Sequence, residues 1–135
     1  MILNQNMSFH HIGCLTDNME QSILGYKEGL GFRNISPVFS IADQQVKVCF
    51  IETGPGAFLE LVQPTGDNAV LKKILKSRNP YYHIGYLVSN IEECISRMQD
   101  EGGYLVNKFR SEAFEHKWCA FLYTKEMHLI ELIER

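Results

Sequence analysis

The chain contains the same short sequence twice. HIGCLTDNMEQSI begins at His11 and HIGYLVSNIEECI begins at His83, and seven of these thirteen positions are identical. The offset is 83 − 11 = 72 residues, slightly more than half of the 135-residue chain. A chain of this length is enough for one compact core and short for two ordinary domains. The repeat therefore predicts two half-domains that share a fold.

Both copies begin with the same order of elements. FHHIGCLT and YYHIGYLV are apolar runs typical of strands, and each is followed by a capping box, DNME or SNIE, with its first residue as N-cap. Helices are expected over MEQSILGYKEGL and IEECISRMQDE, because glycines follow each of them. Three strand-like segments come next in each half: FRNISPVFSI, VKVCFIET and AFLELVQP in the first, and YLVNKFR, KWCAFLYT and HLIELIE in the second.

These elements predict an α+β fold of paired βαβββ modules, neither of which is expected to close a core alone. The modules cover residues of about 8–64 and 81–135, within a single domain of residues 1–135. Only the connector TGDNAVLKKILKSRNP has no counterpart in the repeat, and it is expected to form a short helix at about 65–80.

Composition narrows the class of protein. The net charge of −3 gives no basic field to attract a polyanion, so no nucleic-acid partner is expected. The sequence has no leader-like start and no apolar run long enough to span a bilayer, which favours a cytoplasmic protein without a membrane partner. Four cysteines without a C-x-x-C pair favour buried reduced thiols: Cys14, Cys49, Cys94 and Cys119.

The repeat also matches residues that packing alone does not explain. His11 and His83 are equivalent, and so are Glu60 and Glu131, each in an otherwise apolar strand. Burying a carboxylate without a partner costs several kcal/mol. If the halves pack by a pseudo-twofold axis, the two histidines and two glutamates would converge. A glycine two residues after each histidine would leave room beside them.

A divalent metal would make such a cluster stable. Imidazole and carboxylate ligands suit Co, Zn, Mn, Ni or Fe, and the sequence does not choose among them. A lone strand histidine is more often a core or surface residue, but its duplicated pairing with a glutamate favours one metal ion per chain. His10 and His128 are expected to have no role, because His10 points to the opposite face and His128 has the wrong parity. His116 lies in a loop, where a solvated side chain is expected, although it could also line the mouth of a pocket.

The stretches HIGCLTDNMEQSILGYKEGLGF, FLELVQPTGDNAVLKKIL, YYHIGYLVSNIEECI and CAFLYTKEMHLIELIE resemble the vicinal oxygen chelate superfamily, which includes glyoxalase I and bleomycin-resistance proteins. Within it, ELVQPTGDNAVLKKIL followed by YHIGYLV is most similar to the methylmalonyl-CoA epimerase family. The resemblance covers nearly the whole chain and implies a single vicinal oxygen chelate domain. It further implies a curved mixed sheet around a divalent metal, commonly in a homodimer, with ligands at His11, Glu60, His83 and Glu131.

The same resemblance implies an isomerase that removes a proton α to a thioester, acting on a small molecule such as an acyl-CoA. Glu131 and Asp43 would be the acid and base, because Asp43 is the nearest match to the family's catalytic glutamate, one methylene shorter. KEMHLIEL lacks the glycines usual in the epimerase turn, and epimerases can carry Gln where this chain has Glu60.

Two alternatives remain open. The first is a glyoxalase I-like lyase acting on a glutathione hemithioacetal, and the second is a metal-free small-molecule binding protein. The basic connector residues could contact CoA phosphates or form a solvated helix face: Lys72, Lys73, Lys76 and Arg78.

Overall fold

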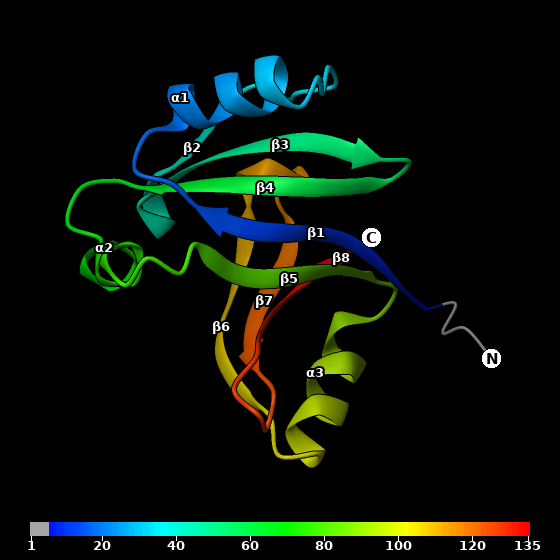
Figure 1. Cartoon of the computed structure of the whole chain (residues 1–135). Coiled ribbons are helices and arrows are strands. Elements are labelled where there is room, and N and C mark those ends of the chain that lie inside the picture. The colour runs from blue at the N-terminus through cyan, green and yellow to red at the C-terminus, as the bar shows by residue number, and fades with distance from the viewer. Residues whose placement is uncertain (1–5) are drawn as a thin grey trace. The chain divides into compact units, whose positions relative to one another are not determined.

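The computed structural model describes residues 6–135. In chain order the elements are β1 (Met7–Leu15), α1 (Met19–Leu24), β2 (Phe39–Ile41), β3 (Val46–Gly54), β4 (Ala57–Pro64), α2 (Ala69–Lys76), β5 (Tyr81–Val88), α3 (Ile91–Asp100), β6 (Tyr104–Ser111), β7 (Lys117–Tyr123) and β8 (Leu129–Glu134) (Figure 1). Short turns of 3-10 helix lie at Ala42–Gln44 and Glu112–Phe114. The expected α+β order of strand, helix and three strands, repeated after a connector helix, is confirmed.

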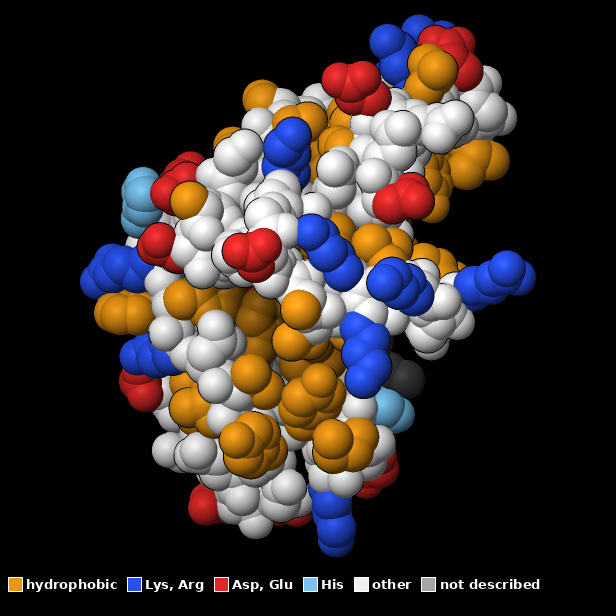
Figure 2. All heavy atoms as spheres, turned by 90° about the vertical axis from the view of Figure 1, so that its left-hand side faces the viewer, with side chains coloured by type: hydrophobic (Ala, Val, Ile, Leu, Met, Phe, Trp, Pro, Cys, Tyr) orange, Lys and Arg blue, Asp and Glu red, His pale blue; other side chains and the backbone are white. Residues whose placement is uncertain are grey.

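The surface carries both signs of charge. On the face drawn in Figure 2, Lys and Arg side chains occur among Asp and Glu side chains, with hydrophobic side chains between them. No helix in residues 6–135 combines the length and the apolar character needed to cross a bilayer.

The chain divides into two compact units, which are described separately. One unit is Ile12–Tyr82, and the other combines the described residues up to His11 with His83–Arg135. Strand β1 contributes to both, with residues 7–11 in the second and 12–15 in the first.

In the unit Ile12–Tyr82 the strand order is β2-β3-β4-β1. The pairs β2/β3 and β3/β4 are antiparallel, and the register of the second pair places Phe50 opposite Glu60. Met19 at the start of α1 packs with Cys49, Ile51 and Leu61 in the core of this unit. Burial of these apolar side chains holds α1 on the sheet.

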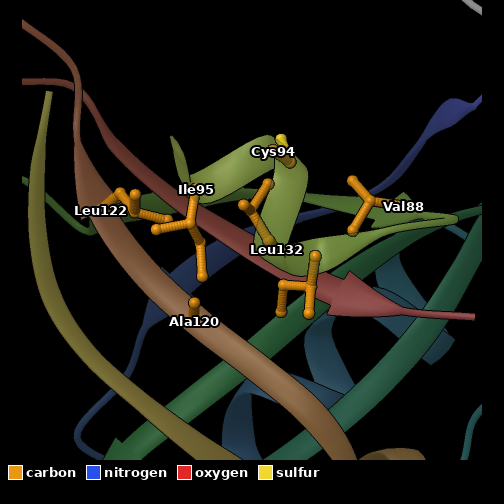
Figure 3. Close-up of a cluster of buried hydrophobic side chains, with 7 residues drawn as sticks. Val88, Cys94, Ile95, Ala120, Leu122 and Leu132 are labelled. Carbon is orange, nitrogen blue, oxygen red and sulfur yellow. The ribbon is translucent and has the colours of Figure 1, made fainter. Parts of the chain in front are cut away.

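In the unit completed by His83–Arg135 the strand order is β5-β8-β7-β6. Strands β5 and β8 are parallel, whereas β8/β7 and β7/β6 are antiparallel, so the sheet is mixed as expected. Figure 3 shows the core between this sheet and α3, where Ile95 lies near Ala120, Leu122 and Leu132. Glu131 lies on the opposite face of β8 from Leu132, because residues alternate along a strand.

Local structure departs from the sequence expectation at both helix starts. The N-caps are Asn18 and Asn90, one residue later than the first residues of DNME and SNIE. Each asparagine has an extended backbone, and its side chain accepts a hydrogen bond from the amide three residues later. That geometry satisfies an amide at the helix start that has no partner within the helix.

The first long strand expected after α1 is also shorter than predicted. FRNISPVFSI forms a strand only at Phe39–Ile41, preceded by an isolated bridge between Ile35 and Ile51. Pro37 lies between the two, and proline cannot donate a backbone hydrogen bond to a strand ladder. The segment is therefore interrupted rather than continuous.

The prediction of buried reduced thiols is confirmed. All four cysteines are free and buried. Burial raises the pKa of Cys14, Cys49 and Cys94.

Candidate metal centre

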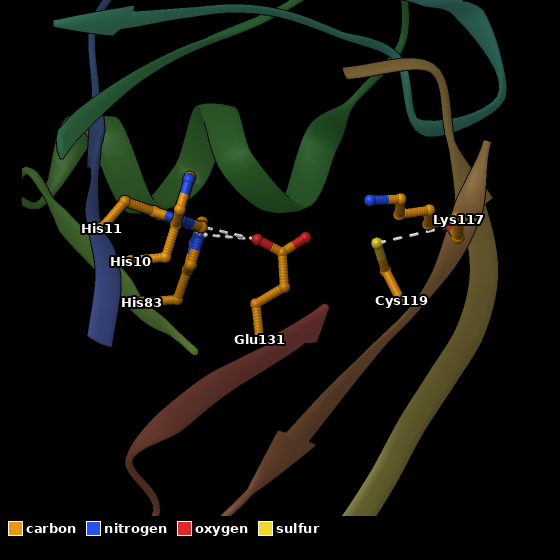
Figure 4. Close-up of polar contacts among 6 residues, drawn as sticks. All are labelled: His10, His11, His83, Lys117, Cys119 and Glu131. Carbon is orange, nitrogen blue, oxygen red and sulfur yellow. Dashed lines mark hydrogen bonds and ion pairs between the residues drawn. The ribbon is translucent and has the colours of Figure 1, made fainter. Parts of the chain in front are cut away.

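Three of the predicted ligands meet in the unit completed by His83–Arg135. His11 comes from β1, His83 from β5 and Glu131 from β8, and their side chains point toward one another in Figure 4. The two imidazole Nε2 atoms are 2.9 Å apart. Oε1 of Glu131 lies 3.1 Å from Nε2 of His11 and 3.4 Å from Nε2 of His83.

A glycine makes this convergence possible. Gly85 on β5 is the register partner of Glu131 on the parallel strand β8. A Cβ on residue 85 would lie only 2.1 Å from Cε1 of His11, and 2.4 and 2.5 Å from its two ring nitrogens. The imidazole of His11 therefore occupies the space that any other side chain at position 85 would fill.

The carboxylate of Glu131 is buried but ionised. Its side chain is 5% exposed, and burial by itself would raise its pKa. The hydrogen-bonding groups and charges of His11 and His83 outweigh burial, so the pKa of Glu131 lies below its usual value.

Among the described residues, Oε1 of Glu131 has no hydrogen bond of acceptable geometry, although two imidazole nitrogens lie close to it. Two imidazole nitrogens and one carboxylate oxygen thus converge, and only the two nitrogens lie at a hydrogen-bond distance with acceptable geometry. This is the donor set that first-row divalent metals prefer, so the residues fit such an ion.

Aromatic rings surround the three residues. Phe121 on β7 is the register partner of Glu131, and its ring meets that of His83 edge-on at a centroid distance of 5.1 Å. Phe114, on the turn after β6, stacks on His11 at 6.1 Å. Apolar surroundings strengthen electrostatic interactions at the centre because they exclude water.

The fourth predicted ligand, Glu60, lies on β4 in the unit Ile12–Tyr82 and is 5% exposed. Its register partner on β3 is Phe50, just as the register partner of Glu131 on β7 is Phe121. All four histidines and glutamates matched by the repeat are thus buried and of types that could hold a metal ion.

The predicted catalytic residue Asp43 is exposed in the 3-10 turn Ala42–Gln44 between β2 and β3. The backbone at the following residue, Gln45, is left-handed, with φ of 53°. The turn Glu112–Phe114 of the other unit is likewise followed by a left-handed residue, Glu115, with φ of 56°. The two turns are therefore equivalent, and each falls where a strand ends.

The expectation that His10 points away from the site was wrong. Nδ1 of His10 lies 2.8 Å from Nδ1 of His11, and the two rings are perpendicular. Burial and the neighbouring His11 lower the pKa of His10 to about 4, against an opposing effect of Glu131. Strand parity gives the direction of a Cβ, and it missed His10 because a histidine ring can reach back to its neighbour.

The remaining expectations concern exposed side chains. His116 and His128 are exposed, and the four basic residues of the connector lie at the surface. Sequence reasoning missed Phe114 as a neighbour of the histidines, since the repeat offers no aromatic residue at the equivalent turn to reveal it.

Comparison with known proteins agrees with the fold. A structure of a hypothetical protein from Bacillus halodurans has 23% identity and a TM-score of 0.84, covering 97% of this chain and 96% of that one. Methylmalonyl-CoA epimerase from Mycobacterium tuberculosis has 23% identity and a TM-score of 0.85, covering 99% and 92%. A methylmalonyl-CoA epimerase in complex with methylmalonyl-CoA and NH4+ has 21% identity and a TM-score of 0.80, covering 96% and 95%.

At these identities the similarities establish the fold. A comparison of the sequence with curated proteins gave no significant match. The model of the glyoxalase/bleomycin resistance protein/dioxygenase superfamily matches residues 10–123, which include both histidines of the repeat and most of both modules. The chain therefore belongs to the glyoxalase/bleomycin resistance protein/dioxygenase superfamily.

Proposed function

We propose that the protein is a metal-dependent isomerase of the methylmalonyl-CoA epimerase type, which removes and returns a proton α to a thioester. One divalent ion would be held by His11, Glu60, His83 and Glu131. The observation that carries the proposal is the buried, ionised carboxylate of Glu131 between two imidazole Nε2 atoms, at 3.1 and 3.4 Å.

The place of Glu60 in this ligand set is supported by the repeat. Within its own unit Glu60 has the same strand register as Glu131, opposite a phenylalanine on the preceding strand. It is also as deeply buried as Glu131, at 5% and 4% exposure. A carboxylate at such a buried position is a ligand type that first-row divalent metals accept.

A carboxylate alone cannot remove the α-proton of a thioester efficiently, because that proton is very weakly acidic. A bound divalent metal supplies a Lewis acid that stabilises negative charge on a carbonyl oxygen. Glu131 is ionised and can accept the proton at one face of the substrate. Asp43 would serve the opposite face, and its exposure allows it to exchange protons with water.

The proposed substrate is a small acyl-CoA. Solved relatives of the same fold include epimerases in complex with methylmalonyl-CoA and with 2-nitronate-propionyl-CoA. Apolar rings next to the candidate centre, Phe114 and Phe121, suit the hydrocarbon part of an acyl group.

A second candidate is a glyoxalase I-like lyase acting on a glutathione hemithioacetal. The observation that favours it is the carboxylate at position 60, since epimerases can carry an amide there. Both reactions share removal of a proton next to a carbonyl group, so the substrate distinguishes them.

Isotope exchange tests the proposed function. Metal-loaded protein in deuterated water should introduce deuterium at C2 of methylmalonyl-CoA. Mass spectrometry measures this incorporation. Asp43→Asn should slow inversion much more than it weakens metal binding, whereas Asp67→Asn, at another exposed turn, should change neither. Turnover of methylglyoxal with glutathione, without any exchange at C2, would replace the epimerase by the lyase. Full metal occupancy with neither reaction would contradict both.

We also propose a homodimer. Strands β2 and β6 each end the strand order of their unit, so each has an edge that pairs with no other described strand. Exposed edges of this kind are commonly covered in soluble proteins. Sedimentation at micromolar concentration should give twice the chain mass of 15.6 kDa, and a monomer there would contradict the proposal.

A further inference from the structure

A neutral imidazole carries one proton on its two nitrogens, so the nitrogen that binds a metal must be the one without it. In His11 the nitrogen facing His83 and Glu131 is Nε2. If His11 is to bind an ion between these residues, its proton has to reside on Nδ1. Something must therefore favour that tautomer.

The side chain of His10 lies in a position to do so. Nδ1 of His10 lies 2.8 Å from Nδ1 of His11, which is a hydrogen-bond distance between two ring nitrogens. One nitrogen must donate and the other accept. If His10 donated, the proton of His11 would be on Nε2 and its lone pair would face away from Glu131. If His10 accepts, Nε2 of His11 presents its lone pair toward Glu131 and His83.

We infer that His10 is a positioning residue, which accepts the Nδ1–H of His11 and so directs the lone pair of Nε2 toward the proposed metal site. This inference rests on the proposed metal site. Ligating histidines are generally held in this way through their second nitrogen, usually by a carboxylate or a carbonyl. Here the adjacent residue of the same strand does it.

Two contacts keep His10 in position. Its ring is perpendicular to that of His11, at an interplanar angle of 89°. Phe114 meets His10 edge-on at 5.4 Å and also lies nearly parallel to His11, at 20°. One aromatic side chain therefore confines both imidazoles, which limits the rotamers that His10 can adopt.

The turn that carries Phe114 is itself firmly defined. It follows Ser111, whose carbonyl accepts a hydrogen bond from the amide of His116 at 2.8 Å. Glu115 and His116 both have left-handed backbones, with φ of 56° and 61°. Such conformations cost free energy in non-glycine residues and persist where the surrounding structure enforces them.

The arrangement is specific to one of the two histidines. The residue before His83 is Tyr82, whose side chain has a hydroxyl group and no ring nitrogen. The repeat is thus symmetric in its proposed ligands and asymmetric in the residue that precedes them. This asymmetry explains why comparison of the two copies did not identify His10.

Two variants of His10 test the inference. His10→Phe keeps a ring that can pack on Phe114 but has no acceptor. His10→Asn places an amide oxygen near the position of Nδ1 and keeps an acceptor. His128→Phe removes an exposed histidine elsewhere and serves as the matched control. Amide NMR spectra establish that each variant is folded.

The first measurement needs no metal and no activity. Long-range nitrogen–proton NMR of metal-free protein should find the proton of His11 on Nδ1 in a larger fraction of molecules in the wild type and in His10→Asn than in His10→Phe. The Glu131 carboxylate, 3.1 Å from Nε2 of His11, favours the other tautomer once the acceptor at position 10 is lost. In His10→Phe that proton should redistribute to Nε2. The second measurement is the affinity for Zn²⁺ in competition with a chelator. It should fall about 10- to 100-fold in His10→Phe, the usual effect of losing such a partner, and recover most of that loss in His10→Asn.

The outcomes separate this inference from the proposed function. An unchanged His11 tautomer and unchanged Zn²⁺ affinity in His10→Phe would overturn the role of His10. Equal losses in His10→Phe and His10→Asn would overturn it too, because the acceptor would then not matter. A wild type that binds no Zn²⁺, yet keeps the proton on Nδ1 in a way that depends on His10, would overturn the metal site and support the hydrogen bond.

Discussion

Gly85 lies against the imidazole of His11, so closely that a Cβ on residue 85 would come within 2.1 Å of the ring. The same glycine is the register partner of Glu131. The absence of a side chain at one position thus brings a histidine from β1 beside a glutamate on β8.

Gly85→Ala should displace His11 and damage the centre. Overpacking of a buried site costs about 1–3 kcal/mol of unfolding free energy, and a shifted imidazole should also weaken metal binding. Denaturant unfolding and Zn²⁺ titration check both effects. Gly25→Ala is the control, because Gly25 is helical with φ of −60° and a Cβ added there would meet no described atom within 4 Å. Wild-type affinity in Gly85→Ala would contradict the packing described for His11.

Metal should stabilise the folded protein if the centre binds it. An ion at 100 times its dissociation constant adds about 2.7 kcal/mol to the unfolding free energy. Thermal unfolding should therefore shift upward with Zn²⁺, Co²⁺ or Mn²⁺ and return with a chelator. His83→Ala and Glu131→Gln should abolish the shift, whereas His128→Ala should retain it. A shift of equal size in His83→Ala would place the ion elsewhere.

The buried thiols should be unreactive in the folded protein. Burial raises the pKa of Cys14, Cys49 and Cys94, so little thiolate forms at about pH 8. A thiol reagent should modify none of them in native protein and four cysteines per chain in denaturant. The raised pKa also makes stability depend on pH, because the folded state keeps its thiols neutral at a pH where the unfolded chain begins to lose their protons. The contribution of the thiols to the unfolding free energy should be constant below about pH 8.5 and fall above it. Rapid native labelling would contradict this burial.

Replacing Asn90, the N-cap of α3, should lower the unfolding free energy more than replacing Ser89. The side chain of Asn90 accepts from the amide of Glu93, so Asn90→Ala should cost about 1 kcal/mol of unfolding free energy. The Ser89 hydroxyl accepts from the exposed Arg135, and Ser89→Ala should change stability by less than about 0.5 kcal/mol. Denaturant unfolding compares the two. The reverse order would favour the cap that the sequence motif predicted.

The paired pattern of residues explains what could be predicted from the sequence. His11 and His83 were found because a duplicated fold preserves the strand position of equivalent residues, and Glu131 followed from its match with Glu60. Period-two alternation then placed the side chains on one face. The order of strands and helices followed from apolar runs and turn residues in the same way.

The helix caps and two neighbours of the metal centre could not be predicted, because they depend on backbone angles and on side-chain rotamers. The caps moved by one residue because Asp and Ser compete with an adjacent Asn, and only the backbone angles decide between them. Strand alternation places the Cβ of His10 on the opposite face from that of His11, but its ring turns toward the ring of His11. Phe114 contacts His10 from a turn that is followed by residues with left-handed backbones. Those residues are Glu115 and His116, so no glycine in the sequence indicated this turn.

Glu60 offers the sharpest test of the proposed site, because its register and burial are what connect it with Glu131. Partners outside a ligand shell already contribute about 10- to 100-fold to metal affinity, so the loss of a ligand oxygen in Glu60→Leu should exceed that factor. Glu60→Gln keeps a carbonyl oxygen but loses the charge, and its affinity should lie between those of Glu60→Leu and the wild type. Glu28→Gln, at an exposed position of the same unit, should bind as the wild type does.

The variant Glu60→Gln also separates the two candidate reactions. Epimerases can carry glutamine at this position, so an epimerase should keep much of its deuterium incorporation in Glu60→Gln once a higher metal concentration restores occupancy. A lyase that needs the carboxylate should lose turnover of the hemithioacetal at full occupancy. Competition with a chelator measures the affinity, and mass spectrometry of the acyl-CoA measures the exchange. Wild-type affinity in Glu60→Leu would remove Glu60 from the ligand set and leave a centre of His11, His83 and Glu131.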